Sequence, residues 1–366
     1  MQSNRRSFDG LSSCGCRHLC RRAVTLIEVL TVLGVISLLA AILLPAVQSA
    51  RERARRVQCV DHLRQIGVAI HAHESTHGRL PYTSMLMGEP ERPDRSVHSS
   101  LLPWLDQSAI ADKIDPAVYF LDAPSQPLGK ILVREPDEFA ANELQATEWY
   151  EIAVHHVPVF RCASDGVLAS GGNNYRACLG SWPHVLWPEA TGPELDQTWN
   201  GAWAFARTLT FADFADGTSN TAMFSERVIG DQNGDVYDPF RDYAFHGSPV
   251  TPEEAFETCA QVTVDWPEHD SFLGSTWLFG GWRQTWYSHA FPPNATLPDC
   301  GGGPISIGGG PGAFTARSFH DGGVNVLFAD GRATFVASTV DLTVWRGLGT
   351  RAGSRLDPPE AIVSFP

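Results

Sequence analysis

The stretch that decides the fold is Ala23-Val24-Thr25-Leu26-Ile27-Glu28, followed by residues 29–50, none of which is charged. An α-helix rises about 1.5 Å per residue, so this uncharged run spans about 33 Å as a helix. The hydrocarbon core of a bilayer is about 30 Å thick. Glu28 lies at the start of the run, where a carboxylate in lipid needs a partner or a function. The stretch therefore predicts a single membrane-spanning helix.

These residues resemble the N-terminus of type IV prepilins and pseudopilins, in which a basic leader and a small residue precede an aromatic residue, Thr, Leu, Ile and Glu. The resemblance implies that a prepilin peptidase cuts between Ala23 and Val24 and methylates the new amino group. It also implies that Glu28 acts in assembly with other pilin-like subunits. Ala23 stands where the family usually has Gly, and Val24 stands where it usually has Phe.

A plain membrane anchor and a removable secretory signal are the alternatives for the apolar run. The apolar core of a secretory signal is about 7–15 residues, which is shorter than residues 29–50. By the prepilin resemblance, we expect a single-pass protein of the inner (cytoplasmic) membrane with its head outside the cytoplasm. The cell surface is a second location that this resemblance allows.

The chain is expected to divide into a leader (residues 1–23), a pilin-like helix (residues 24–78) and a head (residues 79–366). The helical pattern runs from about Leu26 to His77, where Gly78 ends it. Its second half carries an apolar stripe at helical spacing, formed by Cys59, Leu63, Ile66 and Ile70. We therefore expect the first half to lie in lipid and the second half to pack against the head.

The composition of the head favours turns and short strands, because the chain contains 33 glycines and 25 prolines. We expect strands near residues 157–162 and 222–226, and a short helix near residues 107–114. Val324, Val326 and Phe328 alternate before Asp330-Gly331, which predicts a β-hairpin with a tight turn. The expected fold is α+β, a long N-terminal helix packed on a large β-rich head.

The charge of the chain argues against a nucleic-acid partner. The net charge is −14, and removal of the leader, with its five Arg and one Asp, takes it to −18. An acidic head repels nucleic-acid phosphates.

The head contains four cysteines, and no two of them form a close Cys-x-x-Cys pair, which argues against a zinc site. Outside the cytoplasm these cysteines can form two disulfides in three alternative ways. Nearness in sequence favours Cys162 with Cys178 and Cys259 with Cys300.

Segments of the head resemble a large bacterial family of prepilin-like proteins whose head has no established function and which is sometimes described as solute-binding-like. Four motifs carry this resemblance, and they are Leu102-Pro103-Trp104-Leu105, Cys162–Asp165, Asp216–Glu226 and His320–Gly331. In the last motif nine residues separate His320 from Asp330-Gly331. The resemblance implies location and architecture rather than an activity.

Four constellations suggest chemistry. His73-Glu74-Ser75-Thr76-His77 matches the pattern of zinc peptidases, but the predicted helix end at Gly78 argues against a catalytic site. Residues 231–238 have oxygen ligands at alternate positions, as in a calcium loop, but lack its turn glycine. An acid–base site is one interpretation of His320, Asp321 and Asp330. We favour a structural interpretation, in which Asp330 shapes the hairpin turn. A fourth group would offer aromatic surfaces for sugars if its rings were exposed, but we expect them to be buried as packing residues. It contains Trp277, Phe279, Trp282, Trp286, Tyr287 and Phe291.

The sequence thus favours a pseudopilin-like structural subunit of a type IV pilus or of a type II secretion-like apparatus. A membrane-anchored protein that binds a solute or a glycan is the alternative, and an anchored hydrolase is a third hypothesis. We expect no enzymatic activity, no cofactor and no metal ligands.

Overall fold

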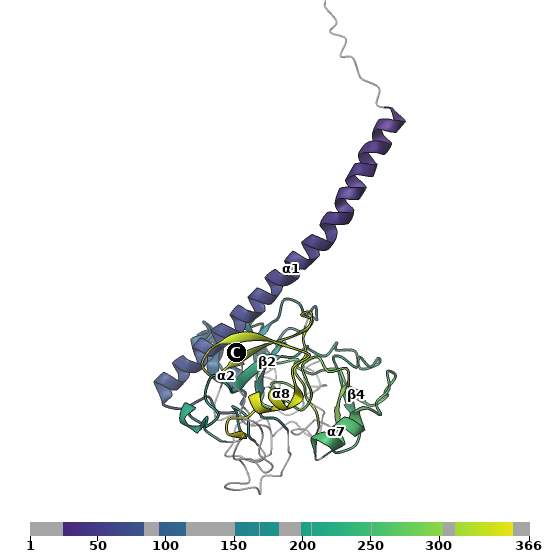
Figure 1. Ribbon diagram of the computed structural model, residues 1–366. Coiled ribbons are helices and arrows are strands. Elements are labelled where there is room, and N and C mark those ends of the chain that lie inside the picture. Colours follow the sequence, from purple (N-terminus) through teal and green to yellow (C-terminus); the bar gives the residue numbers. More distant parts are fainter. Residues whose placement is uncertain are drawn as a thin grey trace, which may run out of the picture. The chain divides into compact units, whose positions relative to one another are not determined.

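The structure is a computed structural model that describes residues 25–83, 95–114, 151–167, 169–182, 199–205, 207–249, 251–302 and 312–353. The chain divides into two compact units, with the boundary after Arg51 (Figure 1). The expected cleavage site at Ala23 and Val24, and the leader before it, lie outside the described residues.

Helix α1 (Leu26–His77) is 52 residues long and has the bounds predicted from sequence. In its most apolar part the mean hydropathy is 2.6 and no residue is buried, so this part is long and apolar enough to cross a membrane. Both a membrane anchor and a signal sequence have this character. At the start of the helix Glu28 accepts hydrogen bonds from the backbone N–H of Thr25 (2.8 Å) and from its hydroxyl (2.9 Å). Because Thr25 also accepts from the backbone N–H of Glu28 (3.3 Å), the two residues form a capping box.

The second half of α1, from Glu52 onward, is part of the head unit. The predicted apolar stripe is buried there, and so are Gly67, Ala69 and His73. A Cβ atom at Gly67 would lie 3.0 Å from Leu327 on strand β7 (Gly323–Phe328), so the absence of a side chain lets helix and strand approach closely. The guanidinium of Arg56 lies 3.5 Å from the ring centre of Phe335 on strand β8 (Ala333–Ala337). The β7–β8 hairpin therefore packs against this half of the helix.

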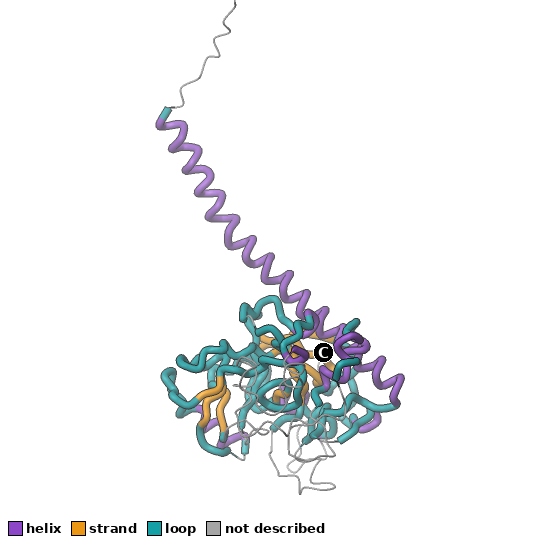
Figure 2. The backbone as a smooth tube through the Cα atoms, turned by 180° about the vertical axis from the view of Figure 1, so that it is seen from behind, coloured by secondary structure: helices purple, strands orange, loops and turns teal. Residues whose placement is uncertain are grey.

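Two sheets form the β part of the described head, and Figure 2 shows their strands from behind. The larger sheet has the order β5-β1-β2-β7-β8, and the smaller one has the order β4-β3-β6. Strands β1 and β5 pair in parallel, as do β3 and β6, and every other neighbouring pair is antiparallel. The remaining strands are β1 (Tyr175–Cys178), β2 (Ala222–Glu226), β3 (Tyr243–Phe245), β4 (His269–Asp270), β5 (Trp286–Tyr287) and β6 (Asp299–Gly301).

The helices of the described head after α1 are short. Figure 1 places α7, with β4 beside it, at the end of the head away from α2. They are α2 (Val97–Leu101), η1 (Leu102–Trp104), α3 (Ser108–Ala111), η4 (Pro158–Phe160), η5 (Phe211–Asp213), α7 (Pro252–Cys259) and α8 (Leu342–Leu348). Long helix, short helices and sheets together confirm the α+β class.

The predicted C-terminal hairpin is confirmed. Val324 pairs with Val336 across the β7–β8 ladder. In the turn, Gly331 has a φ of +86°, a left-handed conformation that glycine adopts without strain. The Asp330 carboxylate accepts from the backbone N–H of Arg332 at 2.9 Å, so Asp330 shapes this turn, as expected.

The expected strand at residues 157–162 is wrong, because Pro158–Phe160 form the 3-10 turn η4. Pro158 stands in its first turn, where the fixed φ of proline suits a helical start and its missing N–H costs no hydrogen bond. The strand at residues 222–226 is present as β2, and the helix near residues 107–114 is reduced to α3.

The structure joins Cys259 at the end of α7 to Cys300 on β6 in a disulfide, the pairing that nearness in sequence favoured. The other expected pair, Cys162 with Cys178, is wrong, since both are free and buried. Cys178 lies on β1 with its sulfur 3.6 Å from the carbonyl oxygen of Gly349. Cys162 follows η4 and faces a different set of side chains, described below.

Ile66→Ala should strongly destabilise the head, because Ile66 is fully buried in the stripe of α1. We expect a loss of about 2–5 kcal/mol in the free energy of unfolding. Val68→Ala is the matched control, since Val68 is 70% exposed on the same helix and its loss should change stability by less than about 0.5 kcal/mol. Urea unfolding of the full chain in detergent, followed by tryptophan fluorescence, measures both. Equal effects of the two substitutions would contradict the packing of this half of α1.

The Cys259–Cys300 disulfide closes a loop with a sequence separation of 41 residues. In the chain-entropy treatment its removal costs about 4 kcal/mol. We expect Cys259→Ser with Cys300→Ser to lower the urea midpoint, and a phosphine reductant to lower that of the wild type but not of the double variant. Peptide mapping without reduction checks the pairing, and free thiols at both positions would show that the bond is absent.

Candidate functional site

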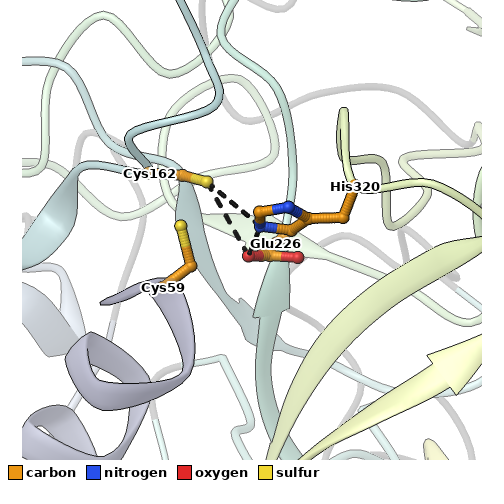
Figure 3. Close-up of side chains that lie close together, drawn as sticks. All are labelled: Cys59, Cys162, Glu226 and His320. Atoms are coloured by element: carbon orange, nitrogen blue, oxygen red, sulfur yellow. Dashed lines mark hydrogen bonds and ion pairs between the residues drawn. The ribbon is translucent and has the colours of Figure 1, made fainter. Parts of the chain in front are cut away.

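Four side chains from distant parts of the sequence meet in the interior of the head (Figure 3). Cys59 comes from α1, Cys162 from the segment after η4, Glu226 from the last position of β2, and His320 from the segment before β7. One sulfur, nitrogen or oxygen atom of each lies within 4.8 Å of the corresponding atom of every other. All four residues are at most 5% exposed. We refer to these four residues as the Cys–His–Glu cluster.

The sheet holds Glu226 in place. Its carboxylate accepts from the backbone N–H of Asn325 (2.8 Å) and from the Asn325 side-chain amide (2.9 Å). Strands β2 and β7 are neighbours in the larger sheet, so Glu226 and Asn325 come from adjacent strands. A buried carboxylate is tolerated only where donors replace water, and Asn325 supplies two.

Both ring nitrogens of His320 have partners. Nε2 faces the cluster, 3.1 Å from Glu226 Oε1 and 3.5 Å from Cys162 Sγ. Nδ1 lies 2.7 Å from Oε1 of Glu52, which is about two turns before Cys59 on α1. Glu52 also accepts from the Ser164 hydroxyl at 3.0 Å. The ring orientation of His320 is therefore set from two sides.

Charge, burial and hydrogen bonding shift the pKa values of His320, Cys59 and Cys162. Burial by itself lowers the pKa of His320, but hydrogen bonds to Cys59, Glu226 and Glu52 outweigh burial and raise the pKa to about 10. The hydrogen bond from Cys162 lowers the pKa of Cys59 to about 5, against burial, which raises it. The pKa of Cys162 is raised by the same hydrogen bond and by burial. Of the two thiols, Cys59 thus ionises first.

The cluster offers two sulfurs, one imidazole nitrogen and one carboxylate oxygen. These are the atoms that bind thiophilic metal ions in proteins, and two neighbouring thiols also have the option of forming a disulfide. Among the described residues, this is the group of His, Cys, Asp and Glu side chains that meets the geometry of a metal site.

The model of the family described as "Protein of unknown function (DUF1559)" matches residues 48–343, which include all four cluster residues. The chain belongs to the DUF1559 family. No curated protein and no solved structure matches it.

In this DUF1559 chain, three motifs of the sequence each contribute one cluster residue. Cys162 begins the segment Cys162–Asp165, Glu226 ends Asp216–Glu226, and His320 begins His320–Gly331. The fourth residue, Cys59, belongs to the apolar stripe of α1. Sequence reasoning missed the cluster because 103, 64 and 94 positions separate successive members, and no Cys-x-x-Cys pair signals it. The available signal was that three motifs each carry a potential metal ligand at one end, namely Cys162, Glu226 and His320.

The zinc-peptidase pattern lies at the end of α1 and does not present two free imidazoles. His73 Nδ1 is 3.1 Å from the carbonyl oxygen of Arg79, and His77 Nδ1 is 3.1 Å from that of His73. The two rings stack on each other at 4.3 Å and pack against Trp104. The histidines therefore bind carbonyl oxygens at the helix end.

The expectation that these aromatic side chains are buried is confirmed, and the alternative, an exposed sugar-binding surface, is wrong. The DUF1559 head uses these side chains as core: Trp282 stacks on Trp199 at 6.0 Å and on Phe314 at 5.4 Å. The group is at most 5% exposed, and it comprises Trp277, Phe279, Trp282, Trp286, Tyr287 and Phe291. Large apolar rings gain more from packing than from water contact.

The calcium-like segment, residues 231–238, uses its side-chain oxygens for its own turns. Asp231 accepts from the N–H of Asn233 at 2.8 Å, and Asn233 accepts from the N–H of Asp235 at 3.1 Å. Nearby, Asp242 accepts from the N–H of Asp238 and from the Ser271 hydroxyl, both at 2.9 Å. Burial raises the pKa of Asp242, and the two hydrogen bonds lower it. The effect of burial is the larger one, so the pKa is raised to about 7.

Asp242 should make the stability of the head fall as pH rises. Its pKa is about 7 in the folded chain and 3.8 ordinarily, so the folded state keeps a proton that the unfolded state releases between these values. The contribution of the protonated Asp242 to the free energy of unfolding is complete below about pH 4 and lost above about pH 7. It amounts to at most about 4 kcal/mol.

Urea unfolding between about pH 4 and 8 tests this expectation. Asp242→Asn cannot ionise, so the variant should gain stability relative to the wild type as pH rises. Asp235→Asn, a change at an exposed carboxylate in the same segment, is the control and should keep the wild-type slope. If Asp242→Asn shows that slope as well, Asp242 ionises normally in the folded chain.

Proposed function

We propose that this DUF1559 chain is a pseudopilin-like structural subunit that is anchored in the inner membrane and carries its head outside the cytoplasm. The observation that carries the proposal is that the two halves of α1 differ in their exposure. One unbroken helix has a first half that is apolar and exposed and a second half whose stripe is buried in the head core. Such a helix would carry both a membrane anchor and a part of the head core.

The disulfide supports a head outside the cytoplasm. Disulfides such as Cys259–Cys300 persist in oxidising compartments and are rare in the reducing cytoplasm. With the head outside, the N-terminal end of α1 faces the cytoplasm, where a prepilin peptidase would cut between Ala23 and Val24. The cell surface is the alternative destination if the subunit is assembled into a pilus.

Glu28 is the residue that we assign to assembly. In a single chain its carboxylate is held by Thr25 in the capping box. After cleavage the amino group of Val24 would lie close to the Glu28 of a neighbouring subunit in a stacked array. A carboxylate in lipid costs several kcal/mol when unpaired and far less when paired with a cation. That pairing would set the axial register between pilin-like subunits of a type IV pilus or a type II secretion-like apparatus.

Glu28→Ala should leave membrane insertion intact, because it removes a charge from an apolar helix, and should reduce higher-order association several-fold. The measurement is chemical crosslinking of intact membranes at equal protein level, with the mature N-terminus determined by mass spectrometry. A methylated Val24 is expected in the wild type and in the variant.

Two control variants separate assembly from helix capping. Thr25→Ala breaks the capping box but keeps the carboxylate, so its oligomer ladder should match the wild type. Ser37→Ala replaces another polar side chain in the apolar run and should also be neutral. If Glu28→Ala gives the wild-type ladder, the helix is a plain anchor and the subunit role fails. If Thr25→Ala loses the ladder too, Glu28 acts through capping alone.

A further inference from the structure

We propose that Cys59, Cys162, Glu226 and His320 form a four-coordinate zinc site that fastens the second half of α1 to the β-sheet of the head. The four donors come from α1, from the segment after η4, from β2 and from the segment before β7. The ligands are spread over more than 250 residues of sequence, from Cys59 to His320. A metal ion bound by all four would link these distant segments.

The separations between donor atoms fit a tetrahedral ion. Zinc lies about 2.3 Å from sulfur and about 2.0–2.2 Å from nitrogen or oxygen, so donors at the corners of the tetrahedron are about 3.3–3.8 Å apart. Cys162 Sγ is 3.5 Å from His320 Nε2 and 3.8 Å from Glu226 Oε1. His320 Nε2 is 3.1 Å from Glu226 Oε1. These three separations are close to those of a tetrahedral ion, and the Cys59 sulfur lies within 4.8 Å of each of the other three donor atoms.

The surroundings of the cluster match those of metal ligands. Metal-bound histidine commonly donates its second ring N–H to a carboxylate, which fixes the ring and strengthens the ligand. His320 has this arrangement, with Nε2 toward the cluster and Nδ1 toward Glu52 at 2.7 Å. Glu226 is oriented in turn by Asn325, and the backbone N–H of Cys162 donates to the Asn174 side chain at 3.0 Å. These partners hold the donors before any ion arrives.

The donor set selects zinc over the hard cations. Calcium and magnesium prefer six or more oxygen ligands, whereas two thiolates and an imidazole suit a tetrahedral thiophilic ion. Four protein donors complete the tetrahedron and leave no position for water or substrate, which is typical of a structural zinc site. The inferred role is therefore stabilisation of the head and not catalysis.

Metal binding also explains why the two thiols are not joined. The disulfide between Cys259 and Cys300 indicates an oxidising compartment, where two unprotected thiols within 4.8 Å would be expected to oxidise. Cys59 and Cys162 are nevertheless free. Coordination would keep both sulfurs as thiolates and block their oxidation. A Cys59–Cys162 disulfide without metal is the competing state that an experiment must distinguish.

The primary test is the metal content of the full chain, purified in detergent without chelators. We expect about one zinc per chain by plasma mass spectrometry, and loss of zinc in Cys162→Ser and in His320→Gln. Cys178→Ser is the matched control, because Cys178 is a buried free cysteine outside the cluster. Peptide mapping without reduction should show alkylatable thiols at Cys59 and Cys162 after zinc removal. A metal-free wild type that cannot be reconstituted with zinc, or a mapped Cys59–Cys162 bond, would overturn the proposal.

Two further measurements keep the test decisive if the ligand variants unfold. Cobalt(II) substituted into the wild type should give a thiolate-to-cobalt charge-transfer band and the intense visible bands of a tetrahedral ion. Their absence after cobalt uptake would overturn the assigned ligands. Glu52→Gln should keep one zinc per chain but bind it about 10–100-fold more weakly in competition with a chromophoric chelator. Asp61→Asn, at an exposed carboxylate on the same helix, should bind as the wild type does. Equal affinity of both variants would remove the supporting role of Glu52. None of these outcomes depends on pilin-like assembly.

Discussion

The structure depends on one constraint, that a single unbroken helix must suit two environments. The first half of α1 is exposed and mostly apolar, a character that membrane anchors and signal sequences share. The second half keeps an apolar stripe on one side and charged residues on the other. The head packs against that stripe, and on the β7–β8 hairpin Leu327 lies so close that a Cβ at position 67 would be only 3.0 Å from it.

The Cys–His–Glu cluster lies where this helix meets the larger sheet. Burying charged and polar groups at such a junction is costly unless each has a partner. Here both the sheet and the helix supply partners. Asn325 from the next strand binds Glu226, and Glu52 from the helix binds His320. The junction is therefore specified by directional contacts as well as by apolar packing. A metal ion among these donors would add strong bonds at the point where helix and sheet have to stay together.

The remainder of the head is stabilised in a more familiar way. Tryptophan and phenylalanine rings fill the main core. Around the smaller sheet the cluster of buried apolar residues is smaller than the main core, and there the Cys259–Cys300 disulfide links α7 to the sheet. The rings whose alternative role was sugar binding are core residues, as the favoured interpretation expected. This use of its side chains agrees with the structural role proposed above.

The sequence by itself determined the features that depend on neighbours in the chain. The bounds of α1 follow from its periodicity and from Gly78, and the hairpin follows from alternation around Asp330-Gly331, because these are local conformational preferences. Local preference also explains the failure at Pro158, where a proline-initiated turn replaced the expected strand. Tertiary structure alone decided the role of Cys162, which lies nearest in sequence to Cys178 but faces Cys59, Glu226 and His320 in space. Such contacts are set by how helix, strands and loops pack, and separations of 64 to 103 positions leave no periodic trace of them in the sequence.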